Sequence, residues 1–270
     1  MIRGIYCALA SFIAAHIFLA PAVLAEEDNY KLLKLQGHFA RWSPIQSSET
    51  TVVTYAFANK IVHSKDARNC GAMQPMGKAL DHSRISMRQF REEFTKATRM
   101  WEEAANIRFV EAATPQVANI LIGAQVRGIG RAFTNVELAA DRVSPGTRQI
   151  KRSLICLNPD MPWKVGFDGD LAAYDLRYTL AHELGHAIGL DHPSERGSLM
   201  FYKYDETQHD LAVGDMAGAA LIYGAGPKFA KAKAETLTPT TELADTNSDG
   251  TEKADEPSSR RSSFGLGGKP

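Results

Sequence analysis

The segment from His182 to His192 limits what this chain can be more than any other part of the sequence. It reads HELGHAIGLDH, with His182 and His186 four residues apart. In a helix, that spacing puts both imidazoles on one face about one turn apart, so both can reach one ion. A continuous helix could not bring His192 to the same ion, but a chain that reverses at Gly189 could. Three neutral imidazoles leave one open position on a tetrahedral zinc, which is typical of a catalytic site.

Glu183 lies beside the first histidine and is the candidate general base. Zinc would acidify a bound water and polarise a scissile carbonyl, and Glu183 could take the proton from that water and pass it to the leaving amine. The alternative is that these are ordinary core or surface histidines without a metal. In that case the histidines, the glutamate and the glycine of this segment would have their spacing by chance. Four other histidines lack ligand spacing, and we expect them at the surface or in polar contacts: His38, His63, His82 and His209.

Hydrophobic periodicity along the chain predicts an α+β fold. A capping-box pattern at Ser86 precedes an amphipathic helix that ends near Asn106, and a second helix is expected from about Leu171 to Gly189. A last helix is expected over 213–223, and strands are expected over 51–57, 107–110, 118–122, 131–135 and 153–157. Residues 59–82 have no clear period and are interpreted as an irregular insertion. The order of these elements favours a twisted sheet with helices packed on it.

The two ends of the chain have compositions unlike the middle. Residues 1–25 are typical of a secretory signal, with Arg3, an apolar stretch and small residues before a cleavage point at Glu26. An uncleaved membrane anchor is the alternative, but His16 and Pro21 interrupt the apolar run. From Ala225 onward the composition predicts a disordered polar tail over 225–270. The folded domain is therefore expected over 26–224, in a secreted or periplasmic protein without stable membrane insertion.

Charge and cysteine content narrow the possible partners and compartment. Lys and Arg number 31 and Asp and Glu number 31, which excludes a nucleic-acid binder that relies on a basic face. Removal of the signal leaves Cys70 and Cys156. Two thiols in an exported protein can form a disulfide, although two cysteines can also lie buried and apart.

The segment from His182 to His192 resembles the zinc signature of the metzincins, and Ser198-Leu199-Met200 resembles their Met-turn. Over about residues 40–224 the chain is most similar to the matrixins, the family of the matrix metalloproteinase catalytic domain. The resemblance implies a zincin fold with a mostly parallel sheet. It implies that His182, His186 and His192 bind one catalytic zinc, that Glu183 is the general base and that Met200 is a packing residue. It also implies that a protein or peptide substrate would lie extended along an edge strand near 130–135. We expect the protein to be a monomer.

The chain also departs from the matrixin pattern. Vertebrate-type matrixins hold a second, structural zinc with histidines in the strands before the active-site helix, but residues 130–133 and 154–156 contain none. We therefore expect a single zinc. If Cys156 replaces one of those ligands, a bond to Cys70 would tie the insertion to the sheet in place of the missing metal.

Cys70 has a second interpretation. Arg68-Asn69-Cys70-Gly71 faintly resembles the thiol switch of matrixin propeptides, in which a thiolate blocks the open zinc position. The residue order is wrong, however, and the motif follows the first expected strand. With about 25 residues between the signal and that strand, no folded prodomain is expected.

Tyr202 and an acidic stretch near the C-terminus are weaker candidates. A tyrosine two residues past the Met-turn methionine stabilises the oxyanion in some metzincins, so Tyr202 could do so or could be a wall residue of the substrate pocket. Four residues with oxygen-bearing side chains lie at the positions that bind calcium in an EF-hand loop: Asp245, Asn247, Asp249 and Glu256. Glu252 and Pro257 count against that loop, and a solvated acidic tract is the commoner outcome.

These features favour an exported zinc endopeptidase. Two other classes stay open from the sequence. One is a non-catalytic binding or inhibitory module that keeps the metal cage, against which the intact Glu183 argues. The other is a zinc hydrolase that acts on a non-peptide bond.

Overall fold

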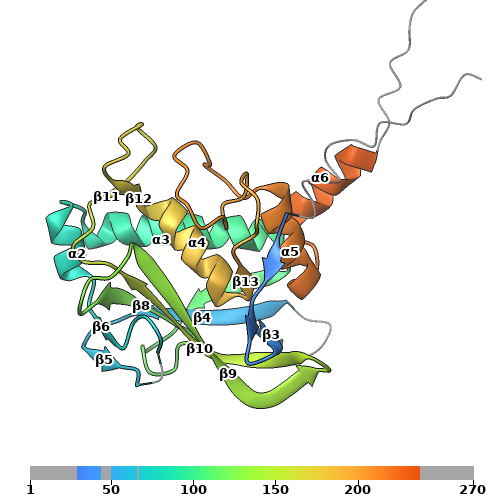
Figure 1. The fold of residues 1–270 in the computed structure, drawn as a ribbon, viewed down its shortest axis with the longest axis horizontal. Coiled ribbons are helices and arrows are strands. Elements are labelled where there is room, and N and C mark those ends of the chain that lie inside the picture. Colours follow the sequence, from blue (N-terminus) through green and yellow to red (C-terminus); the bar gives the residue numbers. More distant parts are fainter. Residues whose placement is uncertain (1–28, 44–49, 66, 238–270) are drawn as a thin grey trace, which may run out of the picture. The chain divides into compact units, whose positions relative to one another are not determined.

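The computed structural model describes residues 29–43, 50–65 and 67–237 (Figure 1). The predicted signal and the predicted calcium loop lie outside these residues. The strands are β1 Lys31–Leu32, β2 Lys34–Leu35, β3 His38–Arg41, β4 Thr51–Phe57, β5 Val62–His63, β6 Ala72–Gln74, β7 Ile107–Glu111, β8 Ile120–Gln125, β9 Ala132–Ser144, β10 Thr147–Leu157, β11 Trp163–Lys164, β12 Tyr174–Asp175 and β13 Leu190–Asp191. The helices are α2 Gly77–His82, α3 Met87–Ala104, α4 Leu176–Ala187, α5 Val213–Tyr223 and α6 Pro227–Leu237.

The central sheet is mostly parallel, as expected. Its strands follow the order β2-β3-β10-β8-β4-β7, and the pairs β3–β10, β10–β8, β8–β4 and β4–β7 are all parallel. Strand β9 runs antiparallel to β10 along the full length of β10 and pairs with no other described strand. The second edge of β9 is therefore free to pair with an extended chain.

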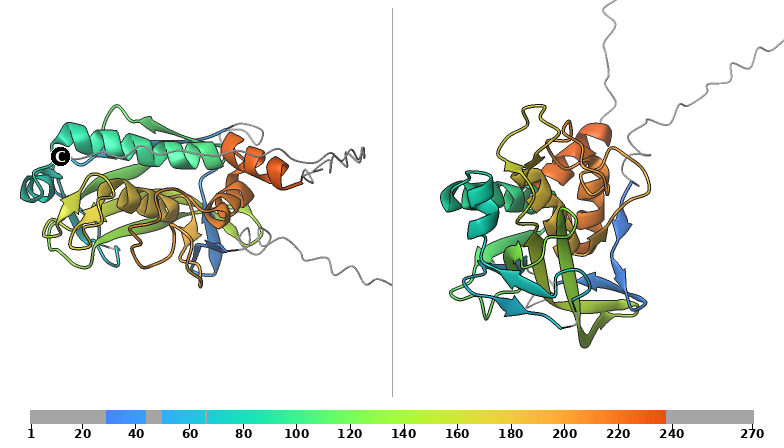
Figure 2. Two further views of the ribbon diagram at one scale, coloured as in Figure 1. Left: turned by 90° about the horizontal axis from the view of Figure 1, so that it is seen from above. Right: turned by 60° about the vertical axis from the view of Figure 1, so that its left-hand side comes forward.

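Helices α3 and α4 cover one face of this sheet (Figures 1 and 2). Helix α3 begins at the predicted capping box, in which Ser86 Oγ accepts a hydrogen bond from the Gln89 amide and Gln89 Oε1 accepts one from the Ser86 amide. Trp101 of α3 is fully buried and donates its indole N–H to the carbonyl of Ala181 in α4 at 2.9 Å. One apolar core joins the two helices to the sheet, which fixes α4 in place.

The part of the insertion around Cys70 and Met73 lies on the other face of the sheet, whereas its helix α2 packs into the core that contains α3 and α4. The insertion contains β5, β6 and α2, and β6 pairs with the end of β8. Cys70 forms a disulfide with Cys156 of β10, which is one of the two alternatives that the sequence left open. Both cysteines are buried in a small second cluster with Met73 and Leu121. Because β8 has apolar neighbours on both faces, all of its residues are buried.

The structure differs from the sequence-based expectations in four respects. Helix α4 begins at Leu176, because the Asp175 carboxylate caps it by accepting from the Tyr178 amide. Strands β9 and β10 form a long hairpin instead of two short strands. The sequence did not predict their length, because polar, partly exposed residues hide the strand pattern. Strands β1 to β3 precede the first expected strand, and they too are short and partly exposed.

The fourth difference concerns the expected tail. Helix α6 occupies Pro227–Leu237, a stretch included in the predicted tail, and Phe229 is 6% exposed against the core. The amide of Gly226 donates to the carbonyl of Ala104 at the end of α3. A single aromatic residue in an Ala- and Lys-rich segment gives little periodicity, so the sequence did not indicate this helix. The compact unit extends to Leu237.

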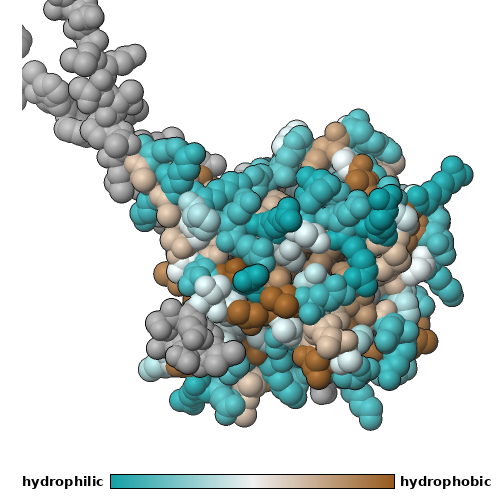
Figure 3. Space-filling model, turned by 180° about the vertical axis from the view of Figure 1, so that it is seen from behind, coloured by the Kyte–Doolittle hydropathy of each residue, from teal (hydrophilic) through white to brown (hydrophobic). Residues whose placement is uncertain are grey.

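Among the described residues, none of the helices has both the length and the apolar content needed to cross a membrane. The face of the molecule behind the view of Figure 1 is largely hydrophilic, with small hydrophobic groups scattered across it (Figure 3).

Candidate metal centre

Helix α4 and the turn that follows it bring three histidines together. Leu176, Leu180 and Leu184 are fully buried against the core, which fixes the rotation of the helix about its axis. Gly189 then reverses the chain with a φ of 105°, a conformation that favours glycine. A Cβ at Gly189 would also overlap the carbonyl oxygen of Ala40. The reversal that the sequence predicted therefore occurs, and it brings His192 back to α4.

The ligand atoms of the three imidazoles converge on one point. Nε2 of His192 lies 3.1 Å from Nε2 of His182 and 3.1 Å from Nε2 of His186. Nitrogens that bind one tetrahedral zinc at 2.0–2.1 Å lie roughly 3.3 Å apart. Among the described residues, these three histidines form a group whose spacing suits a metal ion.

The outer ring nitrogens fix the tautomers of two of these histidines. Nδ1 of His182 lies 2.8 Å from the carbonyl oxygen of Leu199, and Nδ1 of His186 lies 2.9 Å from that of Leu190. A carbonyl can only accept, so both Nδ1 atoms carry the hydrogen and both Nε2 atoms present lone pairs. Lone pairs on neighbouring nitrogens repel each other unless a cation lies between them. The donor set therefore fits a zinc ion.

Burial favours the neutral form of all three histidines. It lowers the pKa of His182 well below the ordinary value and also lowers the pKa of His186. Burial, with the neighbouring His186, lowers the pKa of His192 to about 4. Neutral imidazole is the form that binds metal, so this group could bind a metal ion near neutral pH without prior deprotonation.

Glu183 lies in the same buried helix turn and is 3% exposed. Its carboxylate Oε2 accepts a hydrogen bond from the Thr134 hydroxyl at 2.7 Å. Burial raises the pKa of Glu183, while this hydrogen bond and the charge of Arg131 act in the opposite direction. A buried carboxylate with a raised pKa is suited to accept a proton during a reaction.

Met200 packs against helix α4 at Gly185. It is 2% exposed, and a Cβ at Gly185 of α4 would overlap its Sδ atom. The same Cβ would lie 2.9 Å from Cζ2 of Trp101. Gly185 thus allows close contact between α4, the Met-turn and α3.

A buried aspartate, which sequence reasoning missed, holds the Met-turn. Asp215 of α5 is 1% exposed and accepts hydrogen bonds from the Ser198 hydroxyl and from the amides of Leu199 at 2.8 Å and Met200 at 3.2 Å. Burial raises the pKa of Asp215, and these hydrogen bonds oppose the shift. The Leu199 carbonyl in turn accepts a hydrogen bond from Nδ1 of His182. Asp215 therefore helps to position His182 indirectly, through the backbone of Leu199.

Other residues singled out by the sequence lie in different surroundings. Tyr202 is 54% exposed, and its ring centroid is 6.4 Å from that of His192, so it lies beside the three histidines. Cys70 is bonded to Cys156, so the interpretation as an inhibitory zinc ligand is wrong. His38 contacts the carbonyl of Gln36, and His209 stacks on Phe167 with ring centroids 4.0 Å apart.

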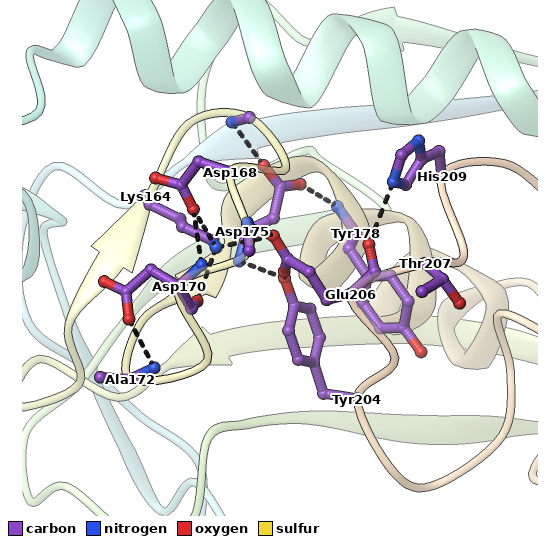
Figure 4. Close-up of polar contacts among 12 residues, drawn as sticks. Lys164, Asp168, Asp170, Ala172, Asp175, Tyr178, Tyr204, Glu206, Thr207 and His209 are labelled. Atoms are coloured by element: carbon purple, nitrogen blue, oxygen red, sulfur yellow. Dashed lines mark hydrogen bonds and ion pairs between the residues drawn. The ribbon is translucent and has the colours of Figure 1, made fainter.

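Two loops beside α4 are joined by Lys164 (Figure 4). Its ammonium contacts Oδ1 of Asp168 at 2.5 Å, the carbonyl of Asp170 at 2.6 Å and Oε1 of Glu206 at 2.8 Å. Glu206 also accepts a hydrogen bond from the Tyr204 hydroxyl. The loop that precedes α4 is thereby fixed to the segment that follows the Met-turn.

The sequence model of the matrixin family matches residues 78–224. The chain belongs to the matrixin family. This matrixin is 28% identical to Metalloendoproteinase 4-MMP of Arabidopsis thaliana over 162 residues, 57% of this chain and 46% of that protein. It is 28% identical to Matrix metalloproteinase-27 of Homo sapiens over 156 residues, 54% of this chain and 29% of that protein. It is 40% identical to Matrix metalloproteinase-16 of Rattus norvegicus over 76 residues, 26% of this chain and 12% of that protein.

The matched part of this matrixin corresponds to less than half the length of each of these relatives. The matched range contains α3, the central strands β7, β8, β9 and β10, and all three converging histidines. The resemblance found from His182 to Met200 is therefore confirmed at the level of the family. Family membership implies zinc as the metal for the three-histidine group.

Proposed function

We propose that this matrixin is an exported, zinc-dependent endopeptidase. The observation that carries the proposal is the convergence of three imidazoles next to the buried Glu183, with Nε2 of His192 3.1 Å from Nε2 of His182 and of His186. His182, His186 and His192 would hold the ion. Bound zinc would supply Lewis acidity toward a water molecule and the scissile carbonyl.

In this proposal the chain's own residues position the reactants and move the proton. Glu183 takes a proton from the attacking water and delivers it to the leaving amine. Thr134 holds the carboxylate of Glu183 by its hydrogen bond to Oε2. The exposed Tyr202 is either a donor to the developing oxyanion or a wall of the substrate site.

The free edge of β9 supports an extended peptide as the substrate. Residues 132–136 of β9 pair with β10 on one side only, and Thr134 within this stretch contacts Glu183. A peptide that adds to this edge would gain main-chain hydrogen bonds and pass beside the general base. We propose that the protein acts as a monomer after removal of residues 1–25, in a secreted or periplasmic location. Calcium binding by residues 245–256 stays a prediction.

Cleavage of an unfolded protein such as casein tests the function. Purified protein with zinc bound should cleave it, lose activity to a zinc chelator and recover on zinc addition. Glu183→Ala should be inactive with zinc still bound, whereas the control Glu195→Ala, at an exposed glutamate, should keep its activity.

The metal count gives an independent result. One zinc per chain is expected, and two would contradict the absence of a structural zinc. If the wild type holds zinc and cleaves no peptide under any condition, the endopeptidase function is wrong. Hydrolysis of a non-peptide ester alone would then favour the other hydrolase class, and no hydrolysis would favour a binding module.

A further inference from the structure

Arg131 lies directly before the edge strand β9, and its guanidinium is surrounded by tyrosines. Cζ of Arg131 lies 5.3 Å from the ring centroid of Tyr174, 5.7 Å from that of Tyr204 and 6.0 Å from that of Tyr178. These rings come from three separate segments, namely β12, the stretch after the Met-turn and α4. Aromatic faces stabilise a cation at such distances without consuming its hydrogen bonds.

The tyrosine cluster adjoins the proposed metal centre. Tyr178 precedes His182 by one turn of α4, and their rings stack with centroids 6.4 Å apart and an interplanar angle of 12°. The backbone of the Arg131 segment is fixed, because Asn158 donates its side-chain amide to the Gly130 carbonyl at 2.6 Å and its main-chain amide to the Arg131 carbonyl at 2.9 Å. Arg131 therefore holds a positive charge at a defined place, and Tyr178 contacts both Arg131 and His182.

Arg131 forms no ion pair among the described residues, although its charge acts to lower the pKa of the nearby Glu183. Its Nε is buried with no hydrogen-bond partner. The carboxylates of the adjoining segments have other donors. Glu206 accepts from Lys164 and Tyr204, and Asp175 accepts from the amides of Gly166 and Tyr178. A partly buried guanidinium outside any ion pair has the capacity for a bidentate bond to a carboxylate.

We propose that Arg131 binds a carboxylate of the peptide substrate, so that this matrixin prefers Asp, Glu or a free C-terminus at one position next to the scissile bond. The proposal rests on the proposed endopeptidase function. A peptide paired with β9 from Ala132 onward would pass beside Arg131, which places one of its side chains or its terminal carboxylate within reach of the guanidinium. Arg131 is thus a specificity-determining residue that touches the substrate.

Mass-spectrometric profiling of cleavage in a library of proteome-derived peptides gives the first test. Acidic residues should be enriched at a single position within about two residues of the cleaved bond. Matched synthetic peptides with Glu, Gln or Lys at that position should then differ in kcat/KM. The Glu peptide should exceed the Gln peptide by roughly tenfold to a hundredfold, as expected for a hydrogen bond between charged groups. A second pair, with a free or an amidated C-terminus at that position, separates the two sources of the carboxylate.

Variants of Arg131 test whether this residue is the cause. In Arg131→Gln the ratio of kcat/KM between the Glu and Gln peptides should fall to about one. Arg131→Lys keeps the charge but loses the planar fork, so its ratio should be intermediate. The control Arg99→Gln removes the same charge from the exposed surface of α3 and should keep the wild-type ratio. Fluorescence anisotropy in a Glu183→Gln background should show the same preference in binding, without any cleavage.

The outcomes separate the specificity from the function. Peptide cleavage with no acidic preference at any position, or a preference that survives in Arg131→Gln, overturns the role of Arg131 and leaves the endopeptidase intact. If the zinc-bound wild type cleaves no peptide, the function fails and the specificity fails with it.

Discussion

The hydroxyl of Thr134 donates to Oε2 of Glu183 at 2.7 Å and lies 2.9 Å from the main-chain oxygen of the same residue. Thr134 belongs to the edge strand β9 and Glu183 to helix α4, 49 residues apart in sequence. The strand proposed to bind the substrate is thus bonded directly to the proposed general base. A peptide that pairs with β9 would meet a carboxylate whose position is already fixed.

Replacement of Thr134 by Val should slow catalysis. Valine has nearly the same shape as threonine but cannot donate a hydrogen bond. The charged carboxylate of Glu183 therefore loses the hydrogen bond that stabilises and positions it. We expect kcat to fall roughly tenfold, within the range for a hydrogen bond to a charged group, with an unchanged zinc content. Steady-state kinetics on a casein-derived peptide measures the change. The control Thr134→Ser keeps the hydroxyl and should stay within about threefold of wild type. A wild-type kcat in Thr134→Val would mean that the contact has no role in positioning Glu183.

Replacement of Gly185 by Ala should destabilise the fold. In an exposed helix this change stabilises by up to about 1 kcal/mol. Here the added Cβ overlaps Sδ of Met200 and approaches Trp101, so overpacking should dominate, with a loss of about 1–3 kcal/mol in the free energy of unfolding. Urea denaturation measures this difference. Gly77→Ala, where a Cβ meets nothing within 4 Å, serves as the control and should change stability by less than about 0.5 kcal/mol. Equal stability of the two variants would show that Met200 and Trp101 move aside at no cost.

Removal of the disulfide should cost stability without removing the metal. The Cys70–Cys156 bond closes a segment with a sequence separation of 86 and joins the insertion to β10. The double variant Cys70→Ala/Cys156→Ala should lose about 2–5 kcal/mol in the free energy of unfolding. Reductant should shift the unfolding midpoint of the wild type and leave that of the double variant unchanged. Zinc content should be the same in both proteins, and a loss of zinc from the double variant would contradict the assignment of the ligands.

Glu93 should make stability depend on acid pH. It is 2% exposed, and its carboxylate bonds to Lys96 at 2.6 Å and to Arg177 of α4 at 2.8 Å. Burial acts to raise the pKa of Glu93, but the hydrogen bonds from Arg177 and Lys96 outweigh it and lower the pKa below 4.5. The folded carboxyl then binds protons less readily than the unfolded one. Its contribution is therefore fully present above pH 4.5 and is lost as the pH falls through the lowered pKa.

Urea denaturation at several pH values tests this dependence. Glu93→Gln should be about 1–3 kcal/mol less stable than wild type at pH 7, allowing for the partial exposure of both cations. The difference should shrink below pH 4.5. The neighbouring Glu92→Gln, at an exposed residue, should show a small difference at every pH. A gap between Glu93→Gln and wild type that does not narrow in acid would contradict the linkage.

Local sequence spacing was sufficient for the elements that one segment defines. The i, i+4 histidines and the glycine after them predicted the helix, the reversal and the convergence of His192, because helix periodicity and a positive φ are properties of neighbouring residues. The capping box at Ser86 and the helix over 213–223 are confirmed for the same reason. Polar strands such as β9 have no such local pattern, and α6 depends on one aromatic contact with the rest of the domain.

The surroundings of the metal centre were decided only by the tertiary structure. Thr134, Asp215 and Arg131 carry no motif, since each acts on α4 or the Met-turn from another element. Sequence left the pairing of Cys70 with Cys156 open, because a disulfide requires a short distance in space that no spacing along the chain specifies. The sequence by itself therefore determined which side chains can bind a metal. The packing of strands and loops around α4 determined what holds Glu183 in place and which tyrosines surround the charge of Arg131.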